Sequence, residues 1–251
     1  MTEIRAVVLA GGKGTRMKSD LPKVLFPVLG RPMVHWVLDA LQEAGIDRKI
    51  VVVGYRAELV EQELRGRSGV EFALQSQQLG TGHAVQMCQE LLTGFSGNVL
   101  VVAGDSPLIQ SSSIRSLIEE FEARKLDCLL GTLKKDNPFG LGRIVRDGRG
   151  LFDRIVEEKD ATEPEKAIQE VNMSTYLFRN EALQWALSQL KNNNSQGEFY
   201  LTDCPKLLKD AGQRVDAVAV LKACEALSIN TIDELGVVEA KMQEMGYPCA
   251  N

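Results

Sequence analysis

Near the start of the sequence, a glycine-rich stretch carries residues that could bind phosphate. Residues 9–25 read LAGGKGTRMKSDLPKVL and follow an apolar run directly. Glycines let backbone N–H groups approach phosphate oxygens, where a side chain would block access. Lys13, Arg16 and Lys23 could add the positive charge that holds a triphosphate. The stretch therefore predicts a phosphate site, with a mobile surface loop as the alternative if the glycine turn is taken alone.

Two familiar phosphate-binding motifs do not describe this stretch. The pattern GxxxxGK[ST] is absent from the sequence. Gly12 and Gly14 begin a GxGxxG pattern, but Met17 stands where its third glycine belongs. We therefore expect neither a P-loop nor a dinucleotide-binding fingerprint.

Two further polar residues stand at the ends of apolar runs. Gln75 offers a donor and an acceptor together, as the edge of a pyrimidine requires, although it could simply be a polar strand terminus. Asp105 follows Gly104, and a carboxylate there is costly to bury unless a cation is paired with it. The alternative for Asp105 is an N-cap ahead of a helix.

The first half of the chain alternates between strand-like and helix-like segments. Continuous apolar runs predict buried strands at residues 4–10, 49–54, 70–75 and 98–103. Helical patterns lie between and after them, at residues 32–44, 57–65, 82–92 and 113–124. This order predicts a mainly parallel sheet with helices on both faces. Ligands of such sheets bind outside the carboxyl ends of the strands, so the glycine-rich stretch, residues 75–82 and residues 104–105 should converge.

The second half predicts an antiparallel extension on the other side of the cleft. Two runs separated by Gly148-Arg149-Gly150 suggest a hairpin of residues 143–147 and 151–157. The expected elements after it are strands at 171–178 and 214–220 and helices at 181–190 and 199–211. A last helix should begin at a capping box of Thr231 and Glu234 and run to about residue 245.

Composition and charge narrow the class of protein. The chain has 251 residues, 44% of them apolar, and a formal net charge of −5, which does not suit a nucleic-acid binder. Residues 1–35 nevertheless carry six Lys and Arg against two acidic residues, a local positive pole that suits a small polyanion. Five cysteines without a CxxC pair predict reduced thiols. No run approaches the roughly 20 apolar residues of a membrane span. We expect a cytoplasmic protein that neither binds nucleic acid nor inserts into a membrane.

Residues 9–25 closely resemble the signature of the sugar-phosphate nucleotidylyltransferase family. The run QSQQLGTGHA at 75–84 narrows the resemblance to the uridylyltransferase half of the bifunctional bacterial enzyme that makes UDP-N-acetylglucosamine. The other matching motifs are GDSPL at 104–108, GLGRI at 140–144, IVEEKDAT at 155–162 and NNNSQGEFYLTD at 192–203. This resemblance implies that the protein transfers UMP from UTP to N-acetylglucosamine 1-phosphate with Mg²⁺ and without a protein nucleophile.

The resemblance also implies roles for particular residues. Those expected to bind the nucleotide are Leu9, Ala10, Gly11, Gly12, Gly14, Lys23, Gln75, Gly80, Thr81, Ala103 and Gly104. Those expected to bind the sugar are Gly140, Glu157 and Asn172. Asp105 and Asn230 would hold Mg²⁺, and Arg16, Lys23 and Asp105 would be the catalytic residues. Glu157 could instead be a solvated strand residue, and Asn230 an ordinary helix cap.

The implied fold is α/β, a Rossmann-like three-layer nucleotidyltransferase fold with a mainly parallel mixed sheet and a small antiparallel sugar-binding extension. Residues 1–229 would form the nucleotidyltransferase domain, with a nucleotide-binding part at about 1–110 and a sugar-binding part at about 111–229. Residues 230–251 would form a C-terminal helix and tail. No hexapeptide repeat occurs, so we expect no acetyltransferase activity.

One departure from the family pattern keeps other functions open. Residues 172–174 read Asn-Met-Ser, where the family usually has Asn-Thr-Gly, so Ser174 adds a side chain near the expected sugar pocket. Another sugar 1-phosphate therefore remains an alternative substrate. A regulator that binds a nucleotide sugar without turnover is a second alternative, and the oligomeric state stays open.

Overall fold

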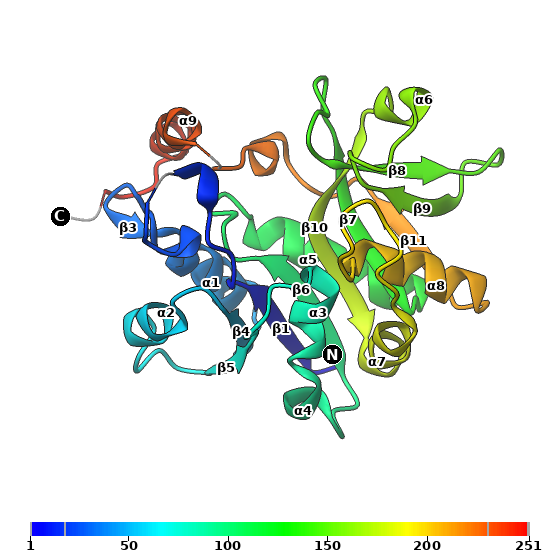
Figure 1. Ribbon diagram of the computed structural model, residues 1–251, viewed down its shortest axis with the longest axis horizontal. Coiled ribbons are helices and arrows are strands. Elements are labelled where there is room, and N and C mark those ends of the chain that lie inside the picture. Colours follow the sequence, from blue (N-terminus) through cyan, green and yellow to red (C-terminus); the bar gives the residue numbers. More distant parts are fainter. Residues whose placement is uncertain (1, 18, 230, 250–251) are drawn as a thin grey trace.

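A mixed β-sheet forms the centre of the computed structural model, which describes residues 2–17, 19–229 and 231–249 (Figure 1). The strands along its main path are, in sheet order, β11 (Val215–Val218), β7 (Cys128–Lys134), β10 (Glu170–Arg179), β6 (Asn98–Ala103), β1 (Ile4–Leu9), β4 (Arg48–Val53) and β5 (Val70–Leu74). Strand β1 is parallel to β4 and β6, β4 is parallel to β5, and β11 is parallel to β7. Strand β10 is antiparallel to both of its neighbours on this path. The predicted mainly parallel mixed sheet is confirmed.

The predicted hairpin is also confirmed. It consists of β8 (Gly142–Arg146) and β9 (Phe152–Val156), which pair in antiparallel fashion, and β8 also pairs with β10. Strand β7 was not predicted. Gly131 interrupts its apolar run, and a glycine in a strand weakens the sequence signal. A Cβ at Gly131 would lie 3.2 Å from the Leu221 side chain, so close packing accounts for the glycine.

Helices cover both faces of the sheet, as predicted. Apolar side chains of α1 (Met33–Glu43), α2 (Ala57–Glu63) and α5 (Ser111–Arg124) pack on one face. Those of α3 (Thr81–Gln86), α4 (Gln89–Leu92), α7 (Asn180–Gln189) and α8 (Cys204–Asp210) pack on the other. The short helix α6 (Glu163–Lys166) follows the hairpin and begins at a capping box.

Two predicted helices are shorter than expected. The helix predicted at 82–92 is divided into α3 and α4. The helix predicted at 199–211 begins only after a 3-10 turn, η3 (Leu201–Asp203). The backbone of Phe199 hydrogen-bonds to Leu79 and Gly82 on another loop, so it does not take part in a helix.

The last helix, α9 (Ile232–Glu244), begins at the predicted capping box of Thr231 and Glu234. It packs near a small two-stranded sheet formed by β2 (Pro27–Val28) and β3 (Arg31–Pro32). The backbone N–H of Leu29 donates to a carboxylate oxygen of Glu239 at 2.8 Å. The C-terminal part of the described chain therefore lies against its N-terminal part. None of the helices described here has the length and apolar character needed to cross a bilayer.

Candidate functional site

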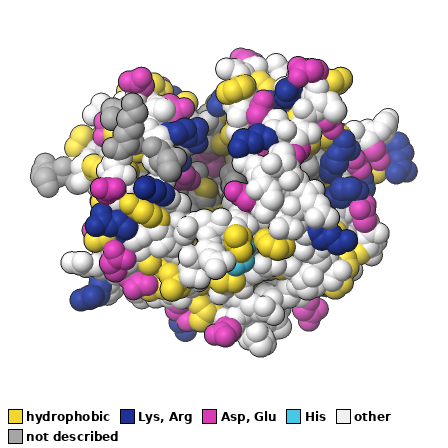
Figure 2. Space-filling model, viewed as in Figure 1, with side chains coloured by type: hydrophobic (Ala, Val, Ile, Leu, Met, Phe, Trp, Pro, Cys, Tyr) yellow, Lys and Arg dark blue, Asp and Glu magenta, His cyan; other side chains and the backbone are white. Residues whose placement is uncertain are grey.

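A cavity of about 380 Å³ lies where strands β1, β5 and β6 end at their carboxyl edge. Figure 2 shows that the surface is hollowed between the part of the molecule that carries α9 and the part that carries β8 and β9. The lining residues are Leu9, Gly11, Gly12, Lys23, Val24, Gln75, Gln78, Gly80, Thr81, Ala84, Ala103, Asp105, Ser174 and Glu198. The three segments expected to converge do meet here, as the strand-end rule for parallel sheets requires.

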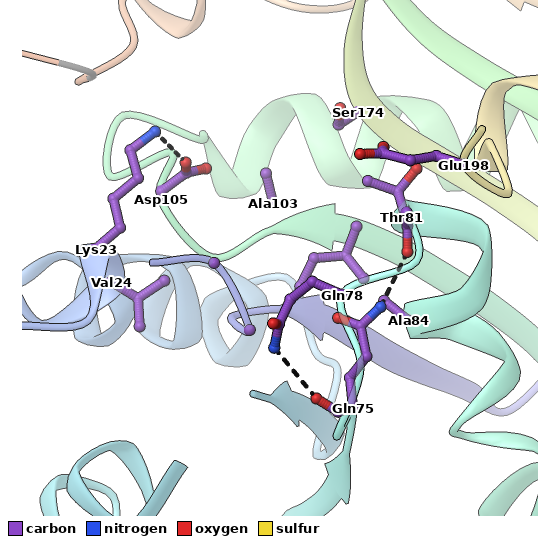
Figure 3. A pocket seen from close by; sticks show the side chains of 14 residues that line it. Lys23, Val24, Gln75, Gln78, Thr81, Ala84, Ala103, Asp105, Ser174 and Glu198 are labelled. Carbon is purple, nitrogen blue, oxygen red and sulfur yellow. Dashed lines mark hydrogen bonds and ion pairs between the residues drawn. The ribbon is translucent and has the colours of Figure 1, made fainter. Parts of the chain in front are cut away.

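An ion pair lies on one side of this cavity (Figure 3). Lys23 Nζ is 2.5 Å from a carboxylate oxygen of Asp105, although the two residues are 82 positions apart. Lys23 lies in the 3-10 turn η2 (Lys23–Leu25), and Asp105 comes just after β6. Both side chains are partly shielded, with 14% and 30% of their surfaces exposed. The carboxylate thus has a cationic partner, and both groups are accessible from the cavity.

Three of the expected nucleotide-binding residues shape the walls but do not line the cavity. The Ala10 N–H donates to the Val52 carbonyl within the sheet, at 2.9 Å. Gly14 has a φ of +67°, and a Cβ there would lie 2.8 Å from Lys23 Cβ. A Cβ on Gly104 would lie 2.9 Å from the Leu9 carbonyl oxygen. Gly14 and Gly104 therefore permit close packing behind residues that do line the cavity.

Gln75 is buried at the end of β5, and its amide holds a neighbouring loop (Figure 3). Its Nε2 donates to the Gly80 carbonyl at 3.0 Å and lies 3.2 Å from His83 Nδ1. Its Oε1 lies on the side of Gly11, 3.1 Å from where a Cβ on that glycine would be. The Gln75 amide therefore joins the glycine-rich stretch to the loop before α3.

That loop is fixed by the chain around Phe199. The Phe199 N–H donates to the Leu79 carbonyl, and the Gly82 N–H donates to the Phe199 carbonyl, both at 2.8 Å. Gly80 has a φ of +106°, and a Cβ there would lie 2.5 Å from the Phe199 carbonyl oxygen. Only glycine fits at this position. We call this contact between residues 79–82 and 198–201 the loop junction.

The loop junction brings Glu198 into the cavity lining. Sequence reasoning assigned no role to Glu198, although it lies within the motif at 192–203. The available signal was the glycine at 197, which marks a turn directly before it.

The three expected sugar-binding residues lie outside the cavity lining. Asn172 Nδ2 donates to the Tyr176 hydroxyl at 2.6 Å, and both side chains are buried. Glu157 accepts a hydrogen bond from the Thr202 hydroxyl at 3.0 Å. The Gly140 N–H donates to the neighbouring carboxylate Glu158 at 2.9 Å. Tyr176 and Thr202 were not predicted, and their hydrogen bonds orient two of the expected residues.

Two carboxyl groups in this region are destabilised as anions by their surroundings. Burial raises the pKa of Glu157, against the opposing hydrogen bond from Thr202, and nearby Asp160 and Asp203 raise it further. Burial also raises the pKa of Asp203, with a contribution from Asp160. A hydrogen-bond donor placed against either carboxylate would stabilise its ionised form.

The remaining expected residues are Arg16 and Asn230. Arg16 lies on the 3-10 turn η1 (Thr15–Met17), where it is exposed and outside the cavity lining. Asn230 lies outside the described residues. Among the described residues no group of three or more His, Cys, Asp or Glu side chains could hold a metal. A cation at Asp105 would thus depend on ligand oxygens as well, and this is the arrangement that Mg²⁺ commonly has in proteins.

The chain is similar to known proteins over nearly its whole length. It is 45% identical to the bifunctional protein GlmU of Streptococcus suis over 97% of this chain and 53% of that protein. It is 47% identical to the protein of the same name from an Exiguobacterium species, over 95% of this chain and 52% of that protein. The chain therefore spans about half the length of these curated relatives.

Solved structures share the fold at lower identity. A putative glucose-1-phosphate thymidylyltransferase from Bacillus anthracis has a TM-score of 0.78 at 20% identity, with 96% of each chain covered. A UDP-glucose pyrophosphorylase complexed with UDP-glucose has a TM-score of 0.78 at 16% identity, covering 98% of this chain and 100% of that one. A family model described as nucleotidyl transferase matches residues 5–222. This family match, which covers most of the chain, shows that the chain belongs to the nucleotidyl transferase family.

Proposed function

We propose that the protein transfers UMP from UTP to N-acetylglucosamine 1-phosphate and releases pyrophosphate. The observation that carries this proposal is the Lys23–Asp105 pair facing a cavity lined by the glycines of the nucleotide stretch. The similarity to GlmU proteins over about half of their length supports the same activity.

On the nucleotide side, backbone groups would bind the phosphates and Lys23 would neutralise their charge. Gly11 and Gly12 line the cavity without side chains, so their backbone is accessible to phosphate oxygens. Lys23 would move from Asp105 to the phosphates and neutralise the charge that grows on the leaving pyrophosphate. Arg16 would add positive charge from the turn outside the lining. The Gln75 amide, with Gly80 and Thr81, would contact the uracil edge.

Asp105 would hold Mg²⁺ together with phosphate oxygens, and we propose Asn230 as the second protein ligand. Bound Mg²⁺ supplies charge neutralisation at the phosphates. A phosphate oxygen of the sugar phosphate would form a bond to the α-phosphorus of UTP as the bond from that phosphorus to the bridging oxygen of pyrophosphate breaks. Because the attacking group belongs to the substrate, the protein's part is to position the two substrates and to neutralise charge.

On the sugar side, we propose that Glu157 accepts a hydrogen bond from a sugar hydroxyl and that Asn172 and Gly140 complete the pocket. Glu157 is partly buried and already oriented by Thr202, which supports this role. Residues of about 1–110 would thus bind the nucleotide, and those of about 111–229 would bind the sugar. We propose a cytosolic protein, in keeping with its five free thiols.

The test is pyrophosphate release from the purified protein with Mg²⁺, UTP and N-acetylglucosamine 1-phosphate. We expect turnover only when all three are present, and its loss when EDTA is added in excess. Release with a different sugar 1-phosphate alone would keep the reaction and change the substrate. Binding of UTP without turnover of any sugar phosphate would favour a regulatory protein instead.

A further inference from the structure

Ser174 has an unfavourable backbone conformation inside a strand. Among the described residues, the non-glycine residues with positive φ are Leu29, Arg56, Lys125 and Ser174. The first three lie between two short strands, just before α2 and just after α5, where turns account for the conformation. Ser174 has a φ of +54° in the middle of β10. This conformation disfavours every residue with a side chain, so a strand position should select glycine.

The surrounding strand is built around this irregularity. The pairing of β10 with β7 shifts register between Asn172 and Tyr176, so the residues between them form a bulge. A bulge changes the direction of side chains and is common beside functional sites. Here the result is that Ser174 lines the cavity. Figure 3 shows it well separated from Lys23.

Ser174 also joins the cavity to the buried polar residues of the sugar side. Its N–H donates to the Asn172 side-chain oxygen at 3.3 Å. Burial raises the pKa of the Tyr176 phenol, nearby Glu157 raises it further, and hydrogen bonds from Asn172 and Ser174 oppose this rise. Ser174 is therefore the member of this network that lines the cavity, whereas Asn172, Tyr176 and Glu157 lie outside the lining.

We propose that the Ser174 hydroxyl hydrogen-bonds to the substituent next to the anomeric carbon of the sugar phosphate and so helps to select the sugar. This inference rests on the proposed function. The phosphate of the second substrate must reach the phosphates held near Lys23 and Asp105. The sugar must then extend toward Asn172 and Glu157, and Ser174 lines the cavity and hydrogen-bonds to Asn172. The part of the sugar nearest its phosphate is the anomeric carbon and its neighbour. Strain at a binding residue persists where function requires its side chain.

The test compares two variants and two kinds of substrate. Ser174→Ala keeps the Cβ, and with it the backbone strain, but removes the hydroxyl, whereas Ser174→Gly removes both the strain and the hydroxyl. We expect both variants to raise KM for N-acetylglucosamine 1-phosphate about fivefold, the loss of one hydrogen bond, and to leave KM for UTP within about twofold. With 2-deoxyglucose 1-phosphate, which lacks the substituent, the two variants and the unmodified protein should have equal KM values.

A stability measurement separates the effect of losing the Ser174 hydroxyl from the effect of relieving the backbone strain. Lys125→Gly is the matched control, because Lys125 has a φ of +49° but lies at the end of α5, away from the cavity. Ser174→Gly and Lys125→Gly should each raise Tm by about 2–4 °C, and Ser174→Ala should not. Ser174→Gly relieves strain, so we expect it to fold.

Two results would overturn the inference alone. One is an unmodified protein that turns over N-acetylglucosamine 1-phosphate while both Ser174 variants keep its KM. The other is an equal rise in KM for the 2-deoxy substrate, since the hydroxyl would then have no partner on the sugar. An unmodified protein that turns over no sugar phosphate would refute the proposed function and, with it, this inference.

Discussion

The two sides of the cavity are built in different ways. The proposed nucleotide side lies at the ends of parallel strands and consists of glycine backbone, one buried amide and the Lys23–Asp105 pair. The proposed sugar side lies beside antiparallel strands and includes buried side chains that hydrogen-bond to one another, such as Asn172 and Tyr176. The proposed nucleotide side offers backbone groups in fixed positions, which suit phosphate. The proposed sugar side offers hydrogen-bond donors and acceptors on side chains, which individual substitutions can change.

The sharpest test of this comparison is Lys23→Ala. If Lys23 neutralises charge on the leaving pyrophosphate, turnover should fall by about 10²–10³, the usual effect of removing one preorganised charge-stabilising group. The measurement is kcat with saturating Mg²⁺ and both substrates. Lys134→Ala removes a lysine from the exposed end of β7 and should leave kcat unchanged. Turnover in Lys23→Ala equal to that of the control would contradict the role of Lys23.

Gly80→Ala tests whether the nucleotide side depends on backbone shape. A Cβ there would clash with the Phe199 carbonyl, so we expect a loss of about 2–4 kcal/mol in the free energy of unfolding and weaker UTP binding. Gly94→Ala is the control, because Gly94 has a φ of +74° but open space around it, and should cost about 1 kcal/mol. Urea denaturation and titration with UTP measure the two effects. Equal losses of unfolding free energy in the two variants would mean that the clash at the loop junction contributes nothing to the effect of Gly80→Ala.

Glu157→Gln tests whether the sugar side acts through single side chains. We expect KM for the sugar phosphate to rise about tenfold, because a hydrogen bond to a charged acceptor becomes a neutral one. KM for UTP should stay within about twofold. Glu71→Gln changes an exposed residue of β5 and should alter neither constant. A parallel rise in both KM values would mean that the two sides are not separable.

The smallest expected effect is a difference in the pH dependence of stability. Burial raises the pKa of Glu157 in the folded protein, so the folded state binds the proton more tightly than the unfolded chain. The contribution of Glu157 to stability should therefore fall as the pH rises from its ordinary value near 4.5 through the raised pKa. Glu157→Gln should remove this fall and gain stability relative to the unmodified protein at pH 7.

Asp153 provides the opposite case. Hydrogen bonds from Lys209 and Arg154 lower the pKa of its carboxyl against the effect of burial, so its contribution is present at pH 7 and is lost as the pH falls through the lowered pKa. Asp153→Asn should therefore lose stability at pH 7 and differ little from the unmodified protein in acid. Thermal unfolding across pH 3–8 compares the two variants. The same sign of change in both would contradict this account.

The parallel part of the molecule could be predicted from the sequence because a simple rule applies to it. Continuous apolar runs predicted β1, β4, β5 and β6. Because ligands of parallel sheets bind at the carboxyl ends of the strands, Gln75 and Asp105 were then expected in one site, and both line the cavity. The glycine-rich stretch was found by composition. The close packing behind it, such as Gly14 against Lys23, depends on tertiary contacts that a sequence does not display.

The antiparallel part was harder to predict, because no comparable rule says where its side chains meet. Strand β7 was not predicted, because Gly131 interrupts its apolar run. The bulge at Ser174 depends on how β10 pairs with β7. Tyr176 and Thr202 were missed because their roles are to orient other residues. The positions of Gly140, Glu157 and Asn172 came from family resemblance, and their substrate contacts stay predictions.

The loop junction has a consequence for how such a protein can evolve. Its two hydrogen bonds between Phe199 and residues 79–82 join backbone atoms only, so replacing the Phe199 side chain, other than by proline, removes neither of them. The side chain at position 199 can therefore change without displacing the loop before α3. In the proposed function, the side chain at position 199 can vary over evolution while the backbone that would face the nucleotide keeps its shape.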